Sequence, residues 1–390
     1  MTERCDFDPM AEGFIADPHP TYARLRAECP VAHSGRWHGF WALTRFDDVL
    51  AASIDPDTFT SSEGVVVPKN PVSGRRPPLH YDPPEHTVYR QALNPPFTKR
   101  RVRTLDGEVR AIVNDLLDPV LDHGGADMVG AFTSPLATLA FLALLGVSGT
   151  EGDALREHSE RFEAAQIAED RETAETESQR LYHYCRTLVA NRLANPGNPR
   201  TDIVAALATA KPDGRPIDPE VIAGSVRQMI IAAHIAPTCA LASALRHLGL
   251  HPDLEETLRD QPALIPEALE ELLRIYTPNQ GFARTATRDV QVGEAAISAG
   301  DAVALVLTSA NRDESVFPNA DQVVFGRRQH HLGFGHGPHS CIGQHLARLE
   351  MRIALEVLLA RTTRLELDGE PTWMAWPVYG PKTLPMRTTP

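Results

Sequence analysis

The sequence predicts a mainly α-helical protein in which small β-sheets play a minor part. Between about residues 84 and 274, apolar residues recur at spacings of three and four, the pattern of amphipathic helices. Alternating positions that indicate strands occur only in short pieces near the N-terminus and after residue 285. The chain has 390 residues, of which 42% are hydrophobic and 23% charged, and can therefore bury a large core.

We expect one domain spanning residues 1–390, because no internal repeat, low-complexity tract or long linker divides the chain. A small β-rich lobe is expected from parts of residues 35–65, 285–310 and 365–388, and a helical lobe from the remainder. Residues 68–84 are too rich in proline and glycine for regular structure. In chain order, the predicted elements are a helix near Pro20–Glu28, a strand at Gly39–Thr44, helices at Leu105–Leu121, Ser178–Leu193 and Glu267–Ile275, strands at Arg288–Val292 and Ala302–Leu307, a last long helix at Ile342–Arg361, and a strand at Thr363–Leu367.

The charge and hydropathy patterns narrow the range of partners and locations. A formal net charge of −13 argues against nucleic acid as a partner. The densest basic run, Lys99–Arg103, is either a solvated face or a docking patch for an acidic protein. The N-terminus lacks the apolar core of a signal peptide, and the longest apolar run, Leu136–Val147, is about half the length that crosses a bilayer. We expect a soluble, cytoplasmic, monomeric protein that does not associate with membranes.

One cysteine stands in a setting that suggests chemistry. The five cysteines are widely spaced and cannot all pair, so a disulfide framework is not expected. Cys341 follows Gly335 and Gly337, which allow a tight backbone path close to a flat cofactor. It also precedes the last long helix, whose first N–H groups would point at the sulfur and lower its pKa. This setting suits a thiolate that binds a metal.

Two other interpretations of the cysteine are open. Cys341 could be a buried, inert cysteine after a glycine-rich turn. It could also belong to a zinc site, since several histidines lie near it in the sequence. Structural zinc needs four converging ligands at short paired spacing, which a single cysteine on a glycine loop matches poorly. The histidines in question are His330, His331, His336, His339 and His345.

The loop from Phe334 to Gly343 resembles the cytochrome P-450 signature, Phe-Gly-x-Gly-x-(His/Arg)-x-Cys-x-Gly. The matching positions are Phe334, Gly335, Gly337, His339, Cys341 and Gly343. Further motifs resemble those of the family in the family's order: residues 82–90, Glu271–Arg274, and Ala310–Asp313 with Phe317-Pro318. The resemblance covers about residues 13–387. It implies the triangular, mostly helical prism fold of that family.

The resemblance implies a haem b cofactor (iron protoporphyrin IX) with Cys341 as the axial ligand of the iron. Haem carries two propionates, whose burial requires cations and hydrogen-bond donors. The residues implied to hold the cofactor are His86, Arg90, Arg284, His331, Phe334, His339, Cys341 and Gly343.

A Glu-x-x-Arg pair, Glu271 and Arg274, has the spacing of an intrahelical ion pair. In the family this pair is buried and locks the cysteine loop through a further arginine. Arg327 is the expected third member, with Arg328 as the alternative. The role of the three is structural.

The central helix departs from the family pattern. Many members have Ala-Gly-x-(Asp/Glu)-Thr-Thr, in which the acid and the alcohol help to deliver protons. Here Ile235 stands at the position of the acid, Ala236 at that of the alcohol, and Pro237 follows and predicts a kink. We assign no residue a catalytic role. His234 and Thr238 are candidate substitutes, although a side chain that points away from the haem is the simpler expectation.

Two hypotheses about the chemistry would account for the missing acid and alcohol. The substrate itself could complete the proton relay, or the enzyme could couple or desaturate its substrate rather than insert oxygen. Either implies a specific small organic substrate in natural-product biosynthesis. The residues expected to line the substrate pocket are Val66, Met229, Ala233, Ala236, Asn279, Gln280, Phe282 and Tyr379.

The resemblance implies O2 as co-substrate and electrons from a separate ferredoxin and its reductase, because the chain ends soon after Leu384 without a flavin or iron–sulfur extension. Arg100 and Arg348 are candidate contacts for an acidic ferredoxin. The alternatives are a conventional hydroxylase of broad specificity and a haem-thiolate binding or sensor protein without turnover.

Overall fold

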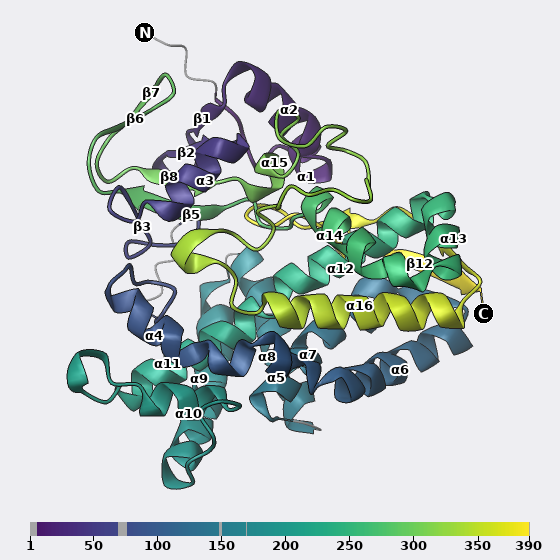
Figure 1. Cartoon of the computed structure of the whole chain (residues 1–390), viewed down its shortest axis with the longest axis horizontal. Coiled ribbons are helices and arrows are strands. Elements are labelled where there is room, and N and C mark those ends of the chain that lie inside the picture. Colours follow the sequence, from purple (N-terminus) through teal and green to yellow (C-terminus); the bar gives the residue numbers. More distant parts are fainter. Residues whose placement is uncertain (1–5, 69–75, 148–149, 169, 390) are drawn as a thin grey trace.

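The computed structural model describes residues 6–68, 76–147, 150–168 and 170–389. Helices form most of the molecule, and the largest sheet lies at one side of it (Figure 1). The helices are α1 Glu12–Ala16, α2 His19–Glu28, α3 Phe46–Ile54, α4 Glu85–Leu93, α5 Lys99–Arg103, α6 Asp106–Asp122, α7 Ser134–Leu145, α8 Thr150–Ile167, α9 Arg171–Ala194, α10 Ile203–Thr209, α11 Pro219–Ala232, α12 Ile235–Leu250, α13 Pro252–Asp260, α14 Ile265–Ile275, α15 Leu307–Ala310 and α16 Gln344–Arg361. The mainly helical class predicted from the sequence is confirmed.

The strands are short and fall into four sheets. The largest sheet has the order β1-β2-β8-β5-β3, with β2 parallel to β8 and the other neighbours antiparallel. The strands are β1 Val31–Ser34, β2 Phe40–Leu43, β3 Phe59–Thr60, β4 Gly125–Asp127, β5 Phe282–Ala286, β6 Val290–Val292, β7 Ala295–Ile297, β8 Ala302–Leu305, β9 Arg364–Leu367, β10 Thr372–Trp373, β11 Pro381–Thr383 and β12 Pro385–Thr389.

The structure divides the segments that were expected to form one β-rich lobe. Strands from residues 31–60 and 282–305 share the five-stranded sheet. The strands of residues 364–389 instead pair with one another and with β4, and β12 lies beside the helical part of the molecule (Figure 1). The reason is the antiparallel pairing of β12 with both β9 and β4, which ties the C-terminal segment to the helices around α6. The turn before β11 reaches the sheet-containing lobe, where Val378 forms a β-bridge with Asn279 and Trp376 packs in its core.

The predicted elements have counterparts whose bounds agree within two residues, from α2 near the N-terminus to α16 and β9, except that α9 begins at Arg171 rather than at Ser178. Residues 69–75 of the predicted irregular segment lie outside the described residues, and 76–84 contain turns only. The apolar run around Leu136 is explained by α7, in which almost every side chain is buried. A helix that is apolar on all sides belongs in a core, and α7 packs in the main hydrophobic cluster with α6, α12 and α16.

The central helix is broken into α11 and α12 at Ala233 and His234. Ala233 has φ −81 and ψ 0, and His234 has φ −101 and ψ −71. Pro237 carries no N–H, so it cannot donate to the carbonyl of Ala233 in the usual helical bond. By length and composition the whole stretch Pro219–Leu250 could cross a membrane, but 56% of its most apolar window is buried inside the protein, as in the core helix of a soluble protein.

We predict that His247 makes stability depend on pH. His247 is buried in α12, and desolvation, aided by nearby His251 and Arg312, lowers its pKa from 6.5 to about 3. Below about pH 6.5 the unfolded chain binds a proton that the folded chain does not. Stability is therefore lost as the pH falls from about 6.5 toward 3, by at most about 1.4 kcal/mol per pH unit.

Urea denaturation between pH 7 and pH 5 measures this effect. The variant His247→Gln should show a flatter dependence of unfolding free energy on pH than the wild type, whereas His183→Gln, at an exposed histidine of α9, should not. Equal slopes for the wild type and His247→Gln would contradict the assignment.

Candidate functional site

The cysteine loop lies between the five-stranded sheet and α4 (Figure 1). Gly335 and Gly337 have φ values of +66 and +71, which favour glycine. A Cβ atom on Gly337 would lie 2.6 Å from the carbonyl oxygen of Ser53 in α3, so a side chain has no room there. The N–H of Cys341 donates to the carbonyl of Phe334 at 2.7 Å and closes the loop.

The sulfur of Cys341 faces an internal space. The residue is accessible to solvent, yet burial within the protein raises the pKa of its thiol. This combination indicates a cysteine on the wall of an interior hollow rather than on the outer surface. The N–H groups of Gly343 and Gln344, at the start of α16, donate hydrogen bonds to the sulfur and lower the pKa of the thiol. The positive charges of Arg90 and Arg348 also lower this pKa.

Four of the residues predicted to hold propionates come together around this loop. The rings of His86 and His339 lie 4.5 Å apart between centroids. Arg90 is one turn after His86 on α4, and its charge acts on Cys341. Arg284 in β5 is buried, and its charge acts on His339. Three separate elements therefore supply the cluster.

The cluster carries positive charge that is poorly compensated. Desolvation lowers the pKa of Arg284 to about 10, and within the described residues no carboxylate lies at ion-pair distance from it. The pKa of His86 is lowered to about 4, mainly by desolvation and then by His339 and Arg90. Nε2 of His86 is buried without a hydrogen-bond partner. A buried arginine, a half-buried arginine and a histidine nitrogen without a partner fit an anionic group with two carboxylates, as haem has.

Asp82 is a member of the cluster that the sequence did not single out as a site residue. Its carboxylate accepts hydrogen bonds from the side chains of Thr60 and Ser61, and lies 3.7 Å from Nε2 of His339. Nε2 of His339 also lies 2.8 Å from the Ser61 hydroxyl. Hydrogen bonds from these groups hold the pKa of Asp82 well below its usual range despite burial. Asp82 thus orients the ring of His339.

The structure does not bring His331 into this cluster. Its Nε2 lies 3.1 Å from Glu270, and its Nδ1 accepts from the N–H of Gly333 at 3.0 Å. Both ring nitrogens are therefore engaged, and no donor remains for a propionate. We do not keep His331 among the proposed haem partners.

Glu270 also accepts two hydrogen bonds from Arg348 in α16, whose guanidinium lies 4.2 Å from the centre of the Phe334 ring. Phe334 is thus held by a stacked arginine next to the loop. Arg348 is consequently not a free cation for a partner protein, contrary to what the sequence suggested.

Glu271, Arg274 and Arg327 form one buried network. Arg274 donates to Glu271 at 2.8 and 2.9 Å, and Nε of Arg327 lies 3.0 Å from both carboxylate oxygens. Arg274 also donates to the carbonyls of Asn311, Ala320 and Gln322, in the segment that leads to the cysteine loop. The third member is Arg327, and Arg328 has no part in this network.

In the broken central helix, the hydroxyl of Thr238 is engaged within its own helix. It donates at 2.8 Å to the carbonyl of His234, one turn earlier, and is buried. His234 points to the neighbouring α7, where Nε2 lies 2.9 Å from the hydroxyl of Ser134. Ile235 and Ala236, which follow His234, begin α12 and are partly accessible.

The residues predicted for the substrate pocket fall into two groups. Val66 and Phe282 are joined by a β-bridge, and Phe282 is 39% exposed, as expected of an apolar wall. Met229, Ala233 and Ala236, which lie before, at and after the break in the central helix, are partly accessible, and so is Asn279.

The second group is Gln280 and Tyr379, which serve packing instead. Gln280 accepts a hydrogen bond from Tyr22 at 2.7 Å and is buried. The Tyr379 ring stacks on Trp373 at 5.2 Å and meets His19 edge-on. We keep neither as a substrate contact.

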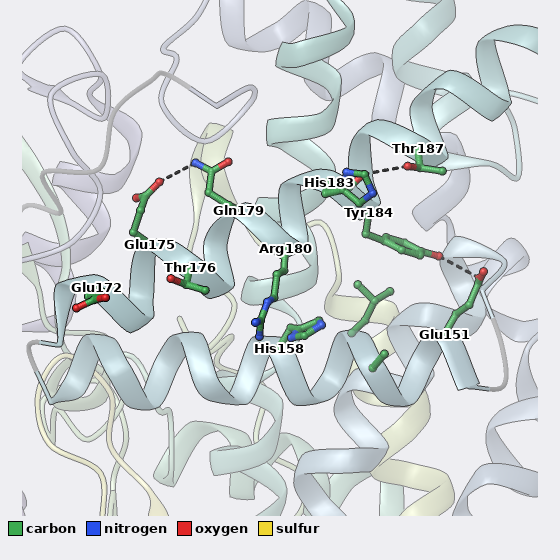
Figure 2. A pocket seen from close by; sticks show the side chains of 12 residues that line it. Glu151, His158, Glu172, Glu175, Thr176, Gln179, Arg180, His183, Tyr184 and Thr187 are labelled. Carbon is green, nitrogen blue, oxygen red and sulfur yellow. Dashed lines mark hydrogen bonds between the residues drawn. The ribbon is translucent and has the colours of Figure 1, made fainter.

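Two further observations bear on alternative sites. Within the described residues no group of three or more His, Cys, Asp or Glu side chains is placed to hold a metal ion, which is unfavourable to a zinc site. A pocket of about 1010 Å³ lies between α8 and α9, lined by residues such as Glu151, His158 and Tyr184 (Figure 2). None of its lining residues belongs to the cysteine loop or the cationic cluster.

Comparison with known proteins agrees with the geometry. Residues 166–375 match the family model for cytochrome P450. The chain is 34% identical over 381 residues to nocardicin C N-oxygenase from Nocardia uniformis subsp. tsuyamanensis, covering 94% of each chain. It is 32% identical over 358 residues to cyclomarin C epoxidase from Salinispora arenicola, covering 88% of this chain and 89% of the relative.

The structure of cytochrome P450 CYP109Q5 from Chondromyces apiculatus superposes with a TM-score of 0.87 at 30% identity, over 99% of this chain and 98% of that one. The chain belongs to the cytochrome P450 family. It is a bacterial P450 monooxygenase whose cofactor is haem b, with relatives in secondary-metabolite biosynthesis.

We predict that Gly337→Ala disrupts the cysteine loop. The new Cβ would meet the Ser53 carbonyl at 2.6 Å in a backbone conformation that disfavours a side chain, so the loop must shift. The purified variant should contain less haem per chain than the wild type, as measured by the absorbance ratio of haem to protein. Gly107→Ala, on α6 where a Cβ meets nothing within 4 Å, is the matched control and should bind haem normally. Full haem content in Gly337→Ala would contradict this view of the loop.

We predict that Glu271→Gln is strongly destabilising. The substitution leaves the buried guanidinium of Arg274 and its neighbour Arg327 without a compensating charge. Breaking a buried ion pair costs about 3–5 kcal/mol. Chemical denaturation should show this loss, whereas Glu256→Gln at an exposed position should change stability by less than about 0.5 kcal/mol. A loss below about 1 kcal/mol for Glu271→Gln would show that the network is not essential.

Proposed function

We propose that this monooxygenase binds the haem iron through the thiolate of Cys341 and oxidises a specific small organic substrate in natural-product biosynthesis. The observation that carries the proposal is the grouping of buried Arg284, half-buried Arg90 and the unsatisfied His86 ring around a cysteine that opens onto an interior space. When bound, haem supplies the oxidising chemistry of the family, and the chain supplies ligation, orientation and electrostatics.

The residues of the site have distinct tasks in this proposal. Arg90, Arg284, His86 and His339 would hold the propionates, and Phe334 and Gly343 would flank the ring and the sulfur. The N–H groups of Gly343 and Gln344 stabilise the charge on the sulfur and moderate its electron donation. The Glu271 network keeps the loop rigid, so that the sulfur stays in one position.

The substrate class rests on two supports. Relatives named as a nocardicin C N-oxygenase and a cyclomarin C epoxidase act on natural products. Ile235 and Ala236 replace the acid and alcohol of the usual proton relay. We therefore propose a specialised biosynthetic enzyme, using either substrate-assisted hydroxylation or oxidative coupling, rather than a broad hydroxylase. A sensor without turnover is not favoured, because the relatives are named as oxygenating enzymes.

The difference spectrum of the reduced protein with carbon monoxide tests the ligand assignment. The wild type should show the strongly red-shifted Soret band of a thiolate-ligated haem, and Cys341→His should bind haem without that band. Cys239→Ser, at a buried cysteine of α12, is the matched control and should keep the band. Retention of the band in Cys341→His, or its absence from the haem-loaded wild type, would overturn the proposal.

For electron supply we propose a separate ferredoxin that docks where α5 meets α14 and α16. A groove of about 820 Å³ lies there, and its lining includes Lys99, Arg103, His345 and Arg352. Arg100 is exposed on the same short helix. Because Arg348 is paired with Glu270, the α5 cations are the better candidates for an acidic partner. We further propose that the protein is soluble, cytoplasmic and monomeric.

We predict that replacing both Lys99 and Arg100 by Gln slows the first electron transfer from a ferredoxin in low salt. Removing two charges weakens steering of an acidic partner, and a reduction in rate of about 10-fold is expected. The difference should vanish at high salt, because screening removes the attraction in both proteins. Stopped-flow reduction at two ionic strengths measures it. Equal rates in low salt would place the docking surface elsewhere.

A further inference from the structure

A chain of hydrogen bonds leads from the break in the central helix to the surface. Nε2 of His234 lies 2.9 Å from the hydroxyl of Ser134, at the start of α7. That hydroxyl lies 2.7 Å from Oε1 of Glu160 in α8, and Arg156 donates to the same oxygen at 2.9 Å. Two consecutive helices, α7 and α8, and the break in the central helix later in the chain thus contribute to one continuous chain of hydrogen bonds.

The burial of the members changes steadily along this chain of hydrogen bonds. His234 is 4% exposed and Ser134 is 7% exposed, whereas the side chain of Glu160 is 35% exposed. The inner end therefore lies in the core beside the helix break, and the outer end is in contact with water. A buried polar side chain needs a reason for its position, since burial without compensation is unfavourable.

Helix capping does not account for the His234 side chain. It stands at the N-cap position of α12, but its side chain makes no capping hydrogen bond. The helix break also follows from Pro237, which removes an N–H whatever side chain His234 carries. The hydroxyl of Thr238, the other candidate, donates a hydrogen bond to the carbonyl of His234. Of the two, only His234 connects the break to a group that exchanges protons with solvent.

Three buried hydroxyl groups that have no hydrogen-bond partner lie next in sequence to this chain of hydrogen bonds or on the same helix face. They belong to Thr133 and Thr138, which flank Ser134 at one and four residues' distance, and to Ser159, next to Glu160. Thr138 shares the helix face of Ser134. Unsatisfied buried hydroxyls beside this chain of hydrogen bonds fit ordered water, which would extend the same hydrogen-bond network.

We propose that Glu160, Ser134 and His234 form a proton route from solvent to the broken helix, in place of the acid and alcohol that the family carries there. The inference rests on the proposed function, since it concerns the haem side of that helix. The solvent proton binds the carboxylate of Glu160, which passes a proton to the Ser134 oxygen while the Ser134 hydroxyl gives its own proton to Nε2 of His234. The imidazole, which starts with its proton on Nδ1, then releases that proton to water at the helix break. One proton moves inward and no electrons move, and exchange of the imidazole between its two tautomers, with rotation of the Ser134 hydroxyl back toward Glu160, restores the starting state.

The geometry assigns different tasks to the neighbours of the route. Arg156 is a positioning residue, because its guanidinium holds the carboxylate of Glu160 against Ser134. His234 itself lies at the break of the central helix, so the imidazole stands where the regular helical backbone is interrupted. A histidine suits such a place, because its ring can take a proton at one nitrogen and release one at the other.

Cyanide and imidazole binding to the ferric haem protein test the route without turnover. Hydrogen cyanide must lose a proton when it binds as cyanide, so its association depends on a nearby proton acceptor. Imidazole binds with no proton transfer and reports only access to the iron. We expect His234→Gln and Ser134→Ala to slow cyanide association by on the order of 100-fold, the lower end of what positioned proton transfer contributes. Imidazole association should stay unchanged in both.

Two matched variants separate a proton route from a structural role. Ser134→Thr keeps the hydroxyl and should keep the wild-type cyanide rate. Glu160→Gln should slow cyanide association, whereas Glu157→Gln, which breaks the exposed pair with Arg161 on the same helix, should not. If the wild-type protein lacks the Soret band of a thiolate-ligated haem, the proposed function itself is overturned. A normal band together with equal cyanide rates in the wild type, Ser134→Ala and His234→Gln would overturn the route alone.

Discussion

The sulfur of Cys341 must be negatively charged in an interior that opposes ionisation, and much of the surrounding structure serves that requirement. Burial alone raises the pKa of the thiol. The N–H groups at the start of α16 and the charges of Arg90 and Arg348 act in the opposite direction. These groups are useful only if the loop holds the sulfur in one place, and so the glycine backbone and the close contact with Ser53 follow from the same constraint.

Two adjacent glutamates on α14 hold the loop from different sides. Glu271 faces the segment before the loop and, through Arg274 and Arg327, fixes carbonyls along that segment. Glu270 faces the other way and holds Arg348 against the ring of Phe334. Because both carboxylates come from one helix, a shift of α14 would move both supports together. The cationic cluster draws its other members from α4 and β5 but shares His339 with the loop, so the propionate site and the thiolate loop are joined at that residue.

The sequence was sufficient where function depends on a contiguous motif, and insufficient where it depends on partners distant in the chain. The cysteine loop and the Glu271–Arg274 pair could be located because spacing alone defines them. The true environments of His331, Gln280 and Tyr379 could not, because Glu270, Tyr22 and Trp373 meet them only in the folded chain.

The central helix shows the same limit. Pro237 predicted a distortion, and the break occurs at Ala233 and His234, within one turn before it. The direction of the His234 side chain, however, is set by its contact with Ser134, a hundred residues earlier in the chain. No sequence pattern around either residue predicts that contact. The sequence also did not predict that the C-terminal strands form sheets separate from the main one. Strand pairing depends on residues far apart in the chain, which local patterns do not identify.

The most direct test of the thiolate site is X-ray absorption at the iron edge of the haem-loaded ferric protein. If Cys341 is the axial ligand, the first coordination shell contains one sulfur neighbour in the wild type and none in Cys341→His. A first shell of nitrogen and oxygen only in the wild type would show that the charge-stabilising loop serves some purpose other than binding iron.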